Sequence, residues 1–104
     1  MSPIDYNPET GTHLIRFEGK MTSDRCREME GQMVVEIEDL LFENPQARLA
    51  FDLGGVDFVV SAFIRICLMT ARRLPKGNFT IVRCRPEVRK IFSVAGLDKL
   101  IELS

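Results

Sequence analysis

The sequence lacks a strong net charge of either sign, and it lacks a hydrophobic run long enough to cross a membrane. Its 104 residues include 14 Lys and Arg and 15 Asp and Glu, which leaves a formal net charge of −1. That balance disfavours a general nucleic-acid binder, which usually presents a basic surface. The richest apolar stretch, residues 58–69, is interrupted by Ser61 and Arg65 and falls short of the roughly 18–20 residues of a membrane span. The first residues show no basic segment followed by an apolar one, so we expect a cytoplasmic protein without direct membrane insertion.

Metal-ligating and nucleophilic side chains are scarce. The cysteines Cys26, Cys67 and Cys84 form no Cys-x-x-Cys pair, and the single histidine, His13, is distant from them in sequence. An odd number of scattered cysteines argues against a disulfide framework and against a Cys/His zinc site. We expect these thiols to act as small buried hydrophobic groups, and His13 to be an ordinary strand residue rather than a catalytic base.

The common catalytic and nucleotide-binding motifs are also absent. The sequence has no Gly-x-x-x-x-Gly-Lys-Ser/Thr loop, no Gly-x-Gly-x-x-Gly turn and no Gly-x-Ser-x-Gly elbow. Carboxylates are plentiful, but nothing sets one pair apart for acid–base catalysis. We therefore expect a protein that is not an enzyme and that uses no cofactor and no metal.

The pattern of apolar residues alternates between strand and helix periods along the chain. This order predicts one α/β domain over residues 1–104, with a mixed, mostly parallel sheet and helices packed on it. Gly54 and Gly55 are expected to end the strand at residues 48–53, and residues 56–60 are expected to continue in extended form. Strands are expected at 4–6, 13–19, 48–53 and 78–84, helices after Thr22 or Ser23, at 61–74 and from Pro86 to Gly96, and a strand or helical turn at 98–103.

Two of these helices have apolar stripes that predict which residues face the core. The stripe of the first helix contains residues at a spacing near 3.6, and charged residues lie mostly off it. We expect Cys26, Met29, Met33, Ile37, Leu40 and Leu41 to face the core in the first helix, and Ile64, Cys67, Leu68, Ala71 and Leu74 in the second.

Charge is unevenly distributed along the chain. Residues 1–52 carry a net charge of −6 and residues 53–104 a net charge of +5. Two interpretations stay open: solvated faces of opposite sign, or a surface that is electrostatically complementary to a partner.

Two segments carry a more specific pattern. In the first, Asp52 ends a strand, Gly55-Val56-Asp57-Phe58 follows, and Ser61 opens a helix; the second contains the runs 86–89 (PEVR) and 96–100 (GLDKL). In this order and spacing they resemble the STAS domain, the family of the anti-sigma factor antagonists and of the C-terminal domains of sulfate transporters. The resemblance covers nearly the whole chain, and residues 48–103 best. It implies an antagonist-type STAS fold whose C-terminal helix is short or missing.

The resemblance also implies a mechanism. In the antagonists, a serine at the start of the second helix is phosphorylated by a partner that is both a serine kinase and an anti-sigma factor, and phosphorylation releases that partner. Ser61 matches this position, and the residues themselves make it a natural N-cap of its helix. A phosphate at a helix N-terminus is compatible with the fold and adds about −1.5 to −2 charges to a docking surface.

The sequence departs from the family pattern around Ser61. Val60 replaces an aspartate, Ala62 a hydroxyl residue and Phe63 a glycine. The loss of the aspartate removes a polar neighbour of the serine, and Phe63 either closes the docking site to a kinase or offers an apolar anchor. Ser61 is therefore either a phosphorylation site or a plain helix cap.

The second helix also carries a basic face, at Arg65, Arg72 and Lys76, with Met69 among them. This face is either solvated or docks an acidic partner, and Arg65 is placed to hold a phosphate on Ser61. The candidate partner-binding residues are Asp57, Phe58, Val60, Ala62, Phe63, Arg65, Met69 and Arg72.

Three functional hypotheses follow. The first is a regulatory binding module that docks on an anti-sigma factor, a serine protein kinase or a related regulatory protein, with no nucleic acid involved. The second is a constitutive, unphosphorylated adaptor of the same fold in a larger complex, for example one associated with transport. The third is a small-ligand binder or an enzyme, with a pocket near Gly54-Gly55 and the N-terminus of the second helix. Self-association into a homodimer is an additional expectation, because a missing C-terminal helix leaves an apolar face open.

Overall fold

A single five-stranded sheet organises residues 4–104, the part of the chain that this computed structural model describes. The strands lie in the order β1-β2-β3-β4-β5; β1 and β2 are antiparallel, and every other neighbouring pair is parallel. The predicted mixed, mostly parallel α/β fold is therefore confirmed. The elements are β1 (Asp5–Asn7), β2 (Thr12–Met21), α1 (Ser23–Glu43), β3 (Arg48–Val59), α2 (Ser61–Arg73), β4 (Phe79–Val82), α3 (Pro86–Val94), the 3₁₀ turn η1 (Leu97–Lys99) and β5 (Glu102–Leu103).

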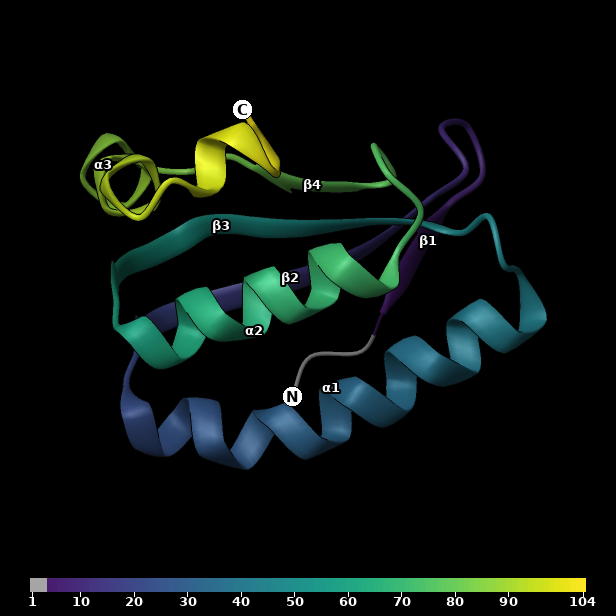
Figure 1. Cartoon of the computed structure of the whole chain (residues 1–104), viewed down its shortest axis with the longest axis horizontal. Coiled ribbons are helices and arrows are strands. Elements are labelled where there is room, and N and C mark those ends of the chain that lie inside the picture. The colour runs from purple at the N-terminus through teal and green to yellow at the C-terminus, as the bar shows by residue number, and fades with distance from the viewer. Residues whose placement is uncertain (1–3) are drawn as a thin grey trace.

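The helices pack on one face of this sheet. Each parallel pair of adjacent strands is joined by a helix, and such crossovers are almost always right-handed. Because the strand order follows the sequence without reversal, α1, α2 and α3 all fall on the same side. Figure 1 shows α1 and α2 lying side by side along the sheet, with α3 at one end of it. A single cluster of buried apolar residues joins the three helices to β2, β3 and β4.

Four phenylalanines form the centre of this core. Phe51 on β3 contacts Phe17 on β2 and Phe79 on β4, with ring centroids 4.9 and 4.8 Å apart in edge-to-face geometry. Phe63 on α2 completes the group, 5.3 Å from Phe17. Such pairs contribute about 0.5–1.5 kcal/mol each beyond the burial of their area. They fix the start of α2 against the middle of the sheet.

The helix ends follow the sequence signals in two of the three helices. Thr22 caps α1, where its side chain accepts a hydrogen bond from the Arg25 N–H. Pro86 opens α3, where its fixed φ suits the first turn and its missing N–H is not needed. Gly96, with φ +80°, ends that helix in the left-handed region that favours glycine. After α3 the described chain continues with η1 and β5.

Two local predictions were wrong. Gly54 and Gly55 do not close a strand, because β3 runs through them to Val59 and stays paired with β2 across two register shifts. The core-facing stripe of α2 also lies on a neighbouring face of the helix. The buried residues there are Phe63, Ile66, Cys67, Thr70 and Leu74, whereas Ile64, Leu68 and Ala71 are half-buried.

Thr70 explains part of this second error. A hydroxyl residue is a poor candidate for a core position, yet Thr70 is fully buried. Its hydroxyl donates to the carbonyl oxygen of Ile66, 2.8 Å away, so its polar group is satisfied inside the helix. In α1 the predicted stripe was better placed, since Cys26, Met29, Met33 and Ile37 are buried, although Leu40 and Leu41 are only half-buried.

No helix among the described residues has the length and hydrophobicity needed to span a bilayer. The residues of β1 are all exposed, and β1 pairs only with β2 at the edge of the sheet.

Candidate functional site at the N-terminus of α2

Ser61 is the first residue of α2 and is exposed. It follows β3 directly, so it lies at the end of the sheet where the parallel strands finish and the helices begin. The N-cap position belongs to Val60, and α2 has no side-chain capping bond. The prediction that Ser61 caps the helix is therefore wrong, because its side chain lies one residue too far along the chain to accept from the first free N–H groups.

The first turn of α2 itself supplies nothing that balances the partial positive charge of the helix N-terminus. Its first turn contains no acidic residue and no capping side chain, whereas α1 has both Thr22 and Asp24 in these roles. The free N–H groups at a helix start favour an anion. Ser61 thus has an exposed hydroxyl that makes no hydrogen bond within residues 4–104, placed where added negative charge is stabilising.

Asp57 and Phe58 form one side of the surface around Ser61. Both are exposed, and Phe58 is 46% exposed, which is high for an aromatic side chain. They lie on the last residues of β3, where Phe58 pairs with Lys20 of β2. An exposed aromatic ring is a common anchor in contact surfaces between proteins.

Val60 and Ala62, the residues on either side of Ser61, are half-buried and pack against the core. They present only part of their surface to a partner.

Phe63 does not belong to this surface. Its side chain is fully buried, and its ring packs edge-to-face on Phe17 and lies 6.4 Å from Phe51. The prediction that Phe63 contacts a partner or closes the docking site is therefore wrong. α2 is rotated so that the third residue of the helix points into the sheet, and the bulky ring fills core volume there.

The basic face of α2 is only partly available to a partner. Arg65 is exposed and lies one turn after Ser61, but its guanidinium pairs with Glu30 of α1 across 3.4 Å. Arg73 pairs in the same way with Glu38. Arg72 is exposed and makes no ion pair within residues 4–104, and Met69 is half-buried between these arginines. Together with Leu68, these residues line a shallow hollow of about 280 Å³.

Sequence reasoning missed a charged cluster on the opposite side of the sheet. The carboxylate of Asp52, a residue only 5% exposed, lies 3.4 Å from Arg83 Nη1 and 3.7 Å from Arg16 Nε. Its other oxygen accepts the Gly54 N–H at 2.9 Å. The signal was present, because an aspartate between buried apolar residues of a strand needs a partner.

Gly54 packs closely against this cluster. A Cβ at this position would lie 2.9 Å from the Nε atom of Arg83, so the flexible end of that arginine would have to shift. Arg85 also donates to the Gly54 carbonyl oxygen at 3.1 Å. The cluster thus fixes the middle of β3, upstream of the segment that leads to Ser61.

Among the described residues, the hollow at Gly54 and Gly55 does not extend to the start of α2, contrary to what the small-ligand hypothesis had expected. A hollow of about 320 Å³ lies at Gly54 and Gly55, but its other lining residues are Arg16, Phe17, Glu18, Asp52 and Arg83. Ser61 and the N-terminus of α2 do not line it. The structure therefore separates the two features that the small-ligand hypothesis combined.

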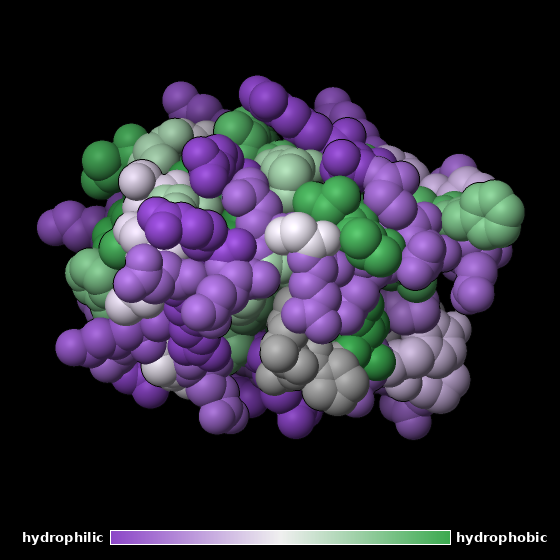
Figure 2. Space-filling view, turned by 90° about the horizontal axis from the view of Figure 1, so that it is seen from below, coloured by the Kyte–Doolittle hydropathy of each residue, from purple (hydrophilic) through white to green (hydrophobic). Residues whose placement is uncertain are grey.

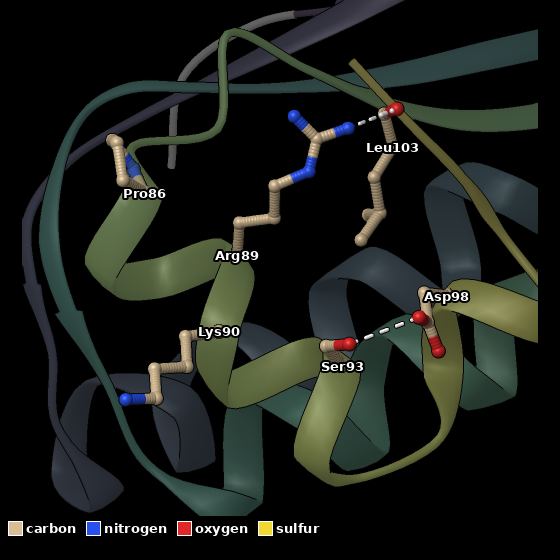
Figure 3. A pocket seen from close by; sticks show the side chains of 6 residues that line it. All are labelled: Pro86, Arg89, Lys90, Ser93, Asp98 and Leu103. Atoms are coloured by element: carbon tan, nitrogen blue, oxygen red, sulfur yellow. Dashed lines mark hydrogen bonds between the residues drawn. The ribbon is translucent and has the colours of Figure 1, made fainter.

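Another hollow, of about 470 Å³, lies between α3, η1 and β5 (Figure 3). Arg89 donates to the Leu103 carbonyl oxygen at 2.8 Å, and Ser93 donates to Asp98 at 2.9 Å. These bonds tie the last strand and the 3₁₀ turn to α3. None of the site residues predicted from the sequence lines this hollow.

Cys26 and Cys67 are buried, as expected, whereas Cys84 is only half-buried. His13 is the strand residue that was expected and lies half-buried on β2. Burial raises the pKa of all three thiols above its ordinary value, and most strongly that of Cys67, which is fully enclosed. Partial burial lowers the pKa of His13 on β2, whose ring packs on Tyr6.

We compared the sequence and the fold of this chain with those of known proteins. No family model matches the chain. A curated relative, "Putative anti-sigma factor antagonist BtrV" of Bordetella bronchiseptica, is 26% identical over 88 residues, which is 83% of this chain and 72% of that protein.

Solved structures agree over the full chain. An anti-sigma factor antagonist from Mycobacterium paratuberculosis has a TM-score of 0.75 at 22% identity and covers 99% of this chain and 83% of its own. An anti-sigma-factor antagonist (STAS) domain protein from Planctomyces limnophilus has a TM-score of 0.75 at 17% identity, with 100% and 90% covered. The anti-sigma factor antagonist SpoIIAA in its unphosphorylated form has a TM-score of 0.72 at 19% identity, with 98% and 88% covered.

These likenesses establish the STAS fold of the anti-sigma factor antagonists for this chain, as the sequence resemblance implied. The similar proteins are named for regulation rather than for a reaction, in agreement with the expectation that the chain is not an enzyme.

Proposed function

We propose that this protein is a non-catalytic regulatory module that docks on an anti-sigma factor, a serine protein kinase or a related regulatory protein in the bacterial cytoplasm. The docking surface is the end of the sheet around the start of α2, and Ser61 is its phosphorylation switch. The observation that carries this proposal is the position of Ser61, an exposed hydroxyl with no structural role at an uncapped helix N-terminus. The curated relative and the similar structures, all named as antagonists, support the regulatory class.

The switch operates by charge rather than by unfolding. A phosphate on Ser61 adds about −1.5 to −2 charges next to free N–H groups that favour an anion, so the fold is kept. The phosphate also adds its negative charge to the docking surface, between the positions of Phe58 and Arg65. A partner that packs on Phe58, or that carries carboxylates toward the basic face, is then repelled. Arg65 is already paired with Glu30, so it neutralises the phosphate only by giving up that pair.

The burial of Phe63 supports access to Ser61. The bulky residue in place of the family glycine lies inside the core, so it does not cover the hydroxyl from the solvent side. Phe58 and Asp57 are then the accessible contacts beside the switch.

A second candidate is a constitutive adaptor of the same fold, which binds its partner without phosphorylation. The observation that favours it is the apolar character of both neighbours of Ser61. Val60 and Ala62 offer no polar group that orients the hydroxyl for transfer of a phosphoryl group. In this case Ser61 is simply a tolerated first-turn residue.

Affinity capture from the source cells separates the two candidates. Wild type, Ser61→Ala and Ser61→Asp serve as baits side by side, and mass spectrometry identifies partners and maps phosphate. The switch requires one regulatory protein with wild type and Ser61→Ala, its loss with Ser61→Asp, and phosphate on Ser61. Equal recovery with all three baits and no phosphate supports the adaptor.

A further inference from the structure

A groove at the other end of α2 combines an apolar floor with a wholly basic rim. It has a volume of about 530 Å³ and lies between the C-terminal half of α2, the start of β4 and η1. Leu68, Leu74 and Phe79 form its floor, and Leu100 flanks it at 67% exposure. An apolar floor beneath charge of one sign suits an occupant of complementary charge that offers one apolar side chain.

The rim consists of Arg72, Lys76 and Lys99, and no acidic residue lines the groove. All three cations are exposed, and none makes an ion pair within residues 4–104. Arg65 and Arg73, by contrast, are neutralised by α1. The groove therefore selects an occupant that places an apolar side chain among carboxylates.

The outer stripe of α1 has this chemistry. It comprises the exposed residues Glu28, Gln32, Val35, Asp39 and Phe42, which follow one another at helical spacing. Phe42 is 90% exposed, the highest value among the exposed large hydrophobic residues, and Glu43 and Asp39 flank it. The helix as a whole contains seven acidic and two basic residues. Figure 2 shows this side of the molecule as mainly hydrophilic, with separate hydrophobic side chains standing out from it.

The two surfaces lie at the same end of the molecule. Glu30 pairs with Arg65 and Glu38 with Arg73, so α1 and α2 run parallel and in step. Their C-terminal ends therefore meet at one side, as Figure 1 shows. In a dimer with its two-fold axis at this end, the Phe42 side chain of each copy would face the groove of the other, and the contact would close on itself.

We propose that the occupant of this groove is a second copy of the chain, with Phe42 seated on the apolar floor and the carboxylates around it facing Arg72, Lys76 and Lys99. The contact lies at the C-terminal end of α2, about 20 Å along the helix from Ser61 at 1.5 Å per residue. Both Ser61 surfaces of the dimer stay open. This inference stands independently of the proposed switch.

Sedimentation velocity of the purified full chain over about 10–500 µM tests the proposal, because symmetric dimers held by small patches of this kind are weak and concentration-dependent. We expect reversible monomer–dimer exchange that weakens at high salt, since screening shortens the reach of the rim charges. A chain that stays monomeric at the highest concentration, or one that grows beyond dimers, overturns the proposal.

Three variants locate the contact. Phe42→Ser removes the apolar group from both halves of a symmetric interface, so the association constant should fall by about tenfold or more. Lys99→Glu reverses one charge on the rim of the groove and should also lower the association constant. Val94→Ser is the matched control, because Val94 is 83% exposed on α3 and does not line the groove. Since Phe42, Lys99 and Val94 are exposed, all three variants should fold. Dimerisation that survives Phe42→Ser, or that Val94→Ser abolishes, contradicts the proposal.

Discussion

Replacement of Phe63 by alanine tests whether α2 is anchored as the structure shows. Phe63 has two aromatic neighbours within the core and no exposed surface. Its ring also holds the first turn of α2, and with it Ser61, against β2. The substitution should therefore lower the free energy of unfolding far more than any change at the docking surface.

The magnitude follows from three contributions. Full burial of a phenylalanine side chain contributes about 1.5–3 kcal/mol, and its edge-to-face contact with Phe17 adds about 0.5–1.5 kcal/mol. The cavity left behind adds further cost, and buried Phe→Ala changes in general cost about 3–5 kcal/mol. We expect a loss in this range. Phe58→Ala, at an exposed position, should cost less than about 1 kcal/mol.

Urea denaturation followed by circular dichroism at 222 nm measures both variants, since the chain has no tryptophan for fluorescence. Phe63→Leu serves as a third variant that refills most of the cavity and should recover more than half of the loss. Equal effects of Phe63→Ala and Phe58→Ala would refute the reasoning. They would mean that the Phe63 side chain is accessible and that the docking surface includes it.

Further expectations concern charge and reactivity. Asp52→Ala should lower the free energy of unfolding by about 1–3 kcal/mol in urea titrations, because it removes a buried charged acceptor of the Gly54 N–H and of Arg83, and the ion-pair partner of Arg16; no loss would contradict the cluster. Ser61→Asp should raise stability by about 0.3–1 kcal/mol through the uncapped helix end, measured as a higher melting temperature, whereas Ser61→Ala should be neutral. Burial raises the pKa of the Cys84 and Cys67 thiols, so little thiolate forms near neutral pH and alkylation should accelerate as pH rises. The half-buried Cys84 should react first, and Cys67 only when the chain unfolds. Rapid labelling of Cys67 at neutral pH would show that this thiol is not buried in the folded chain.

The order of elements could be read from the sequence because each change of hydrophobic period is punctuated by a helix cap, a proline or a glycine. Thr22, Pro86 and Gly96 gave helix boundaries for local reasons that the tertiary structure does not alter. The start of α2 at Ser61 was also predicted, although Val60 rather than Ser61 occupies the N-cap position.

The details of the site depended on packing that local patterns do not contain. The rotation of α2, which buries Phe63 and exposes Arg65, is set by the fit between α1 and the sheet rather than by the helix itself. The pattern of apolar residues did not predict that Thr70 is buried, because its hydroxyl is satisfied by a hydrogen bond within its own helix. The basic groove joins α2 to Lys99 and Leu100, which lie more than twenty residues later in the sequence, so only the fold reveals it.

The central claim is that negative charge at Ser61 releases a docked regulatory partner while the fold remains intact. Isothermal titration of the captured partner with wild type, Ser61→Asp and Gln46→Glu tests this most directly. Gln46 is exposed in the loop between α1 and β3, so Gln46→Glu adds the same charge at the opposite end of the molecule. The account predicts at least about tenfold weaker binding for Ser61→Asp alone, with unchanged circular dichroism. Equal affinity for all three proteins would contradict it and would leave the constitutive adaptor as the function of this chain.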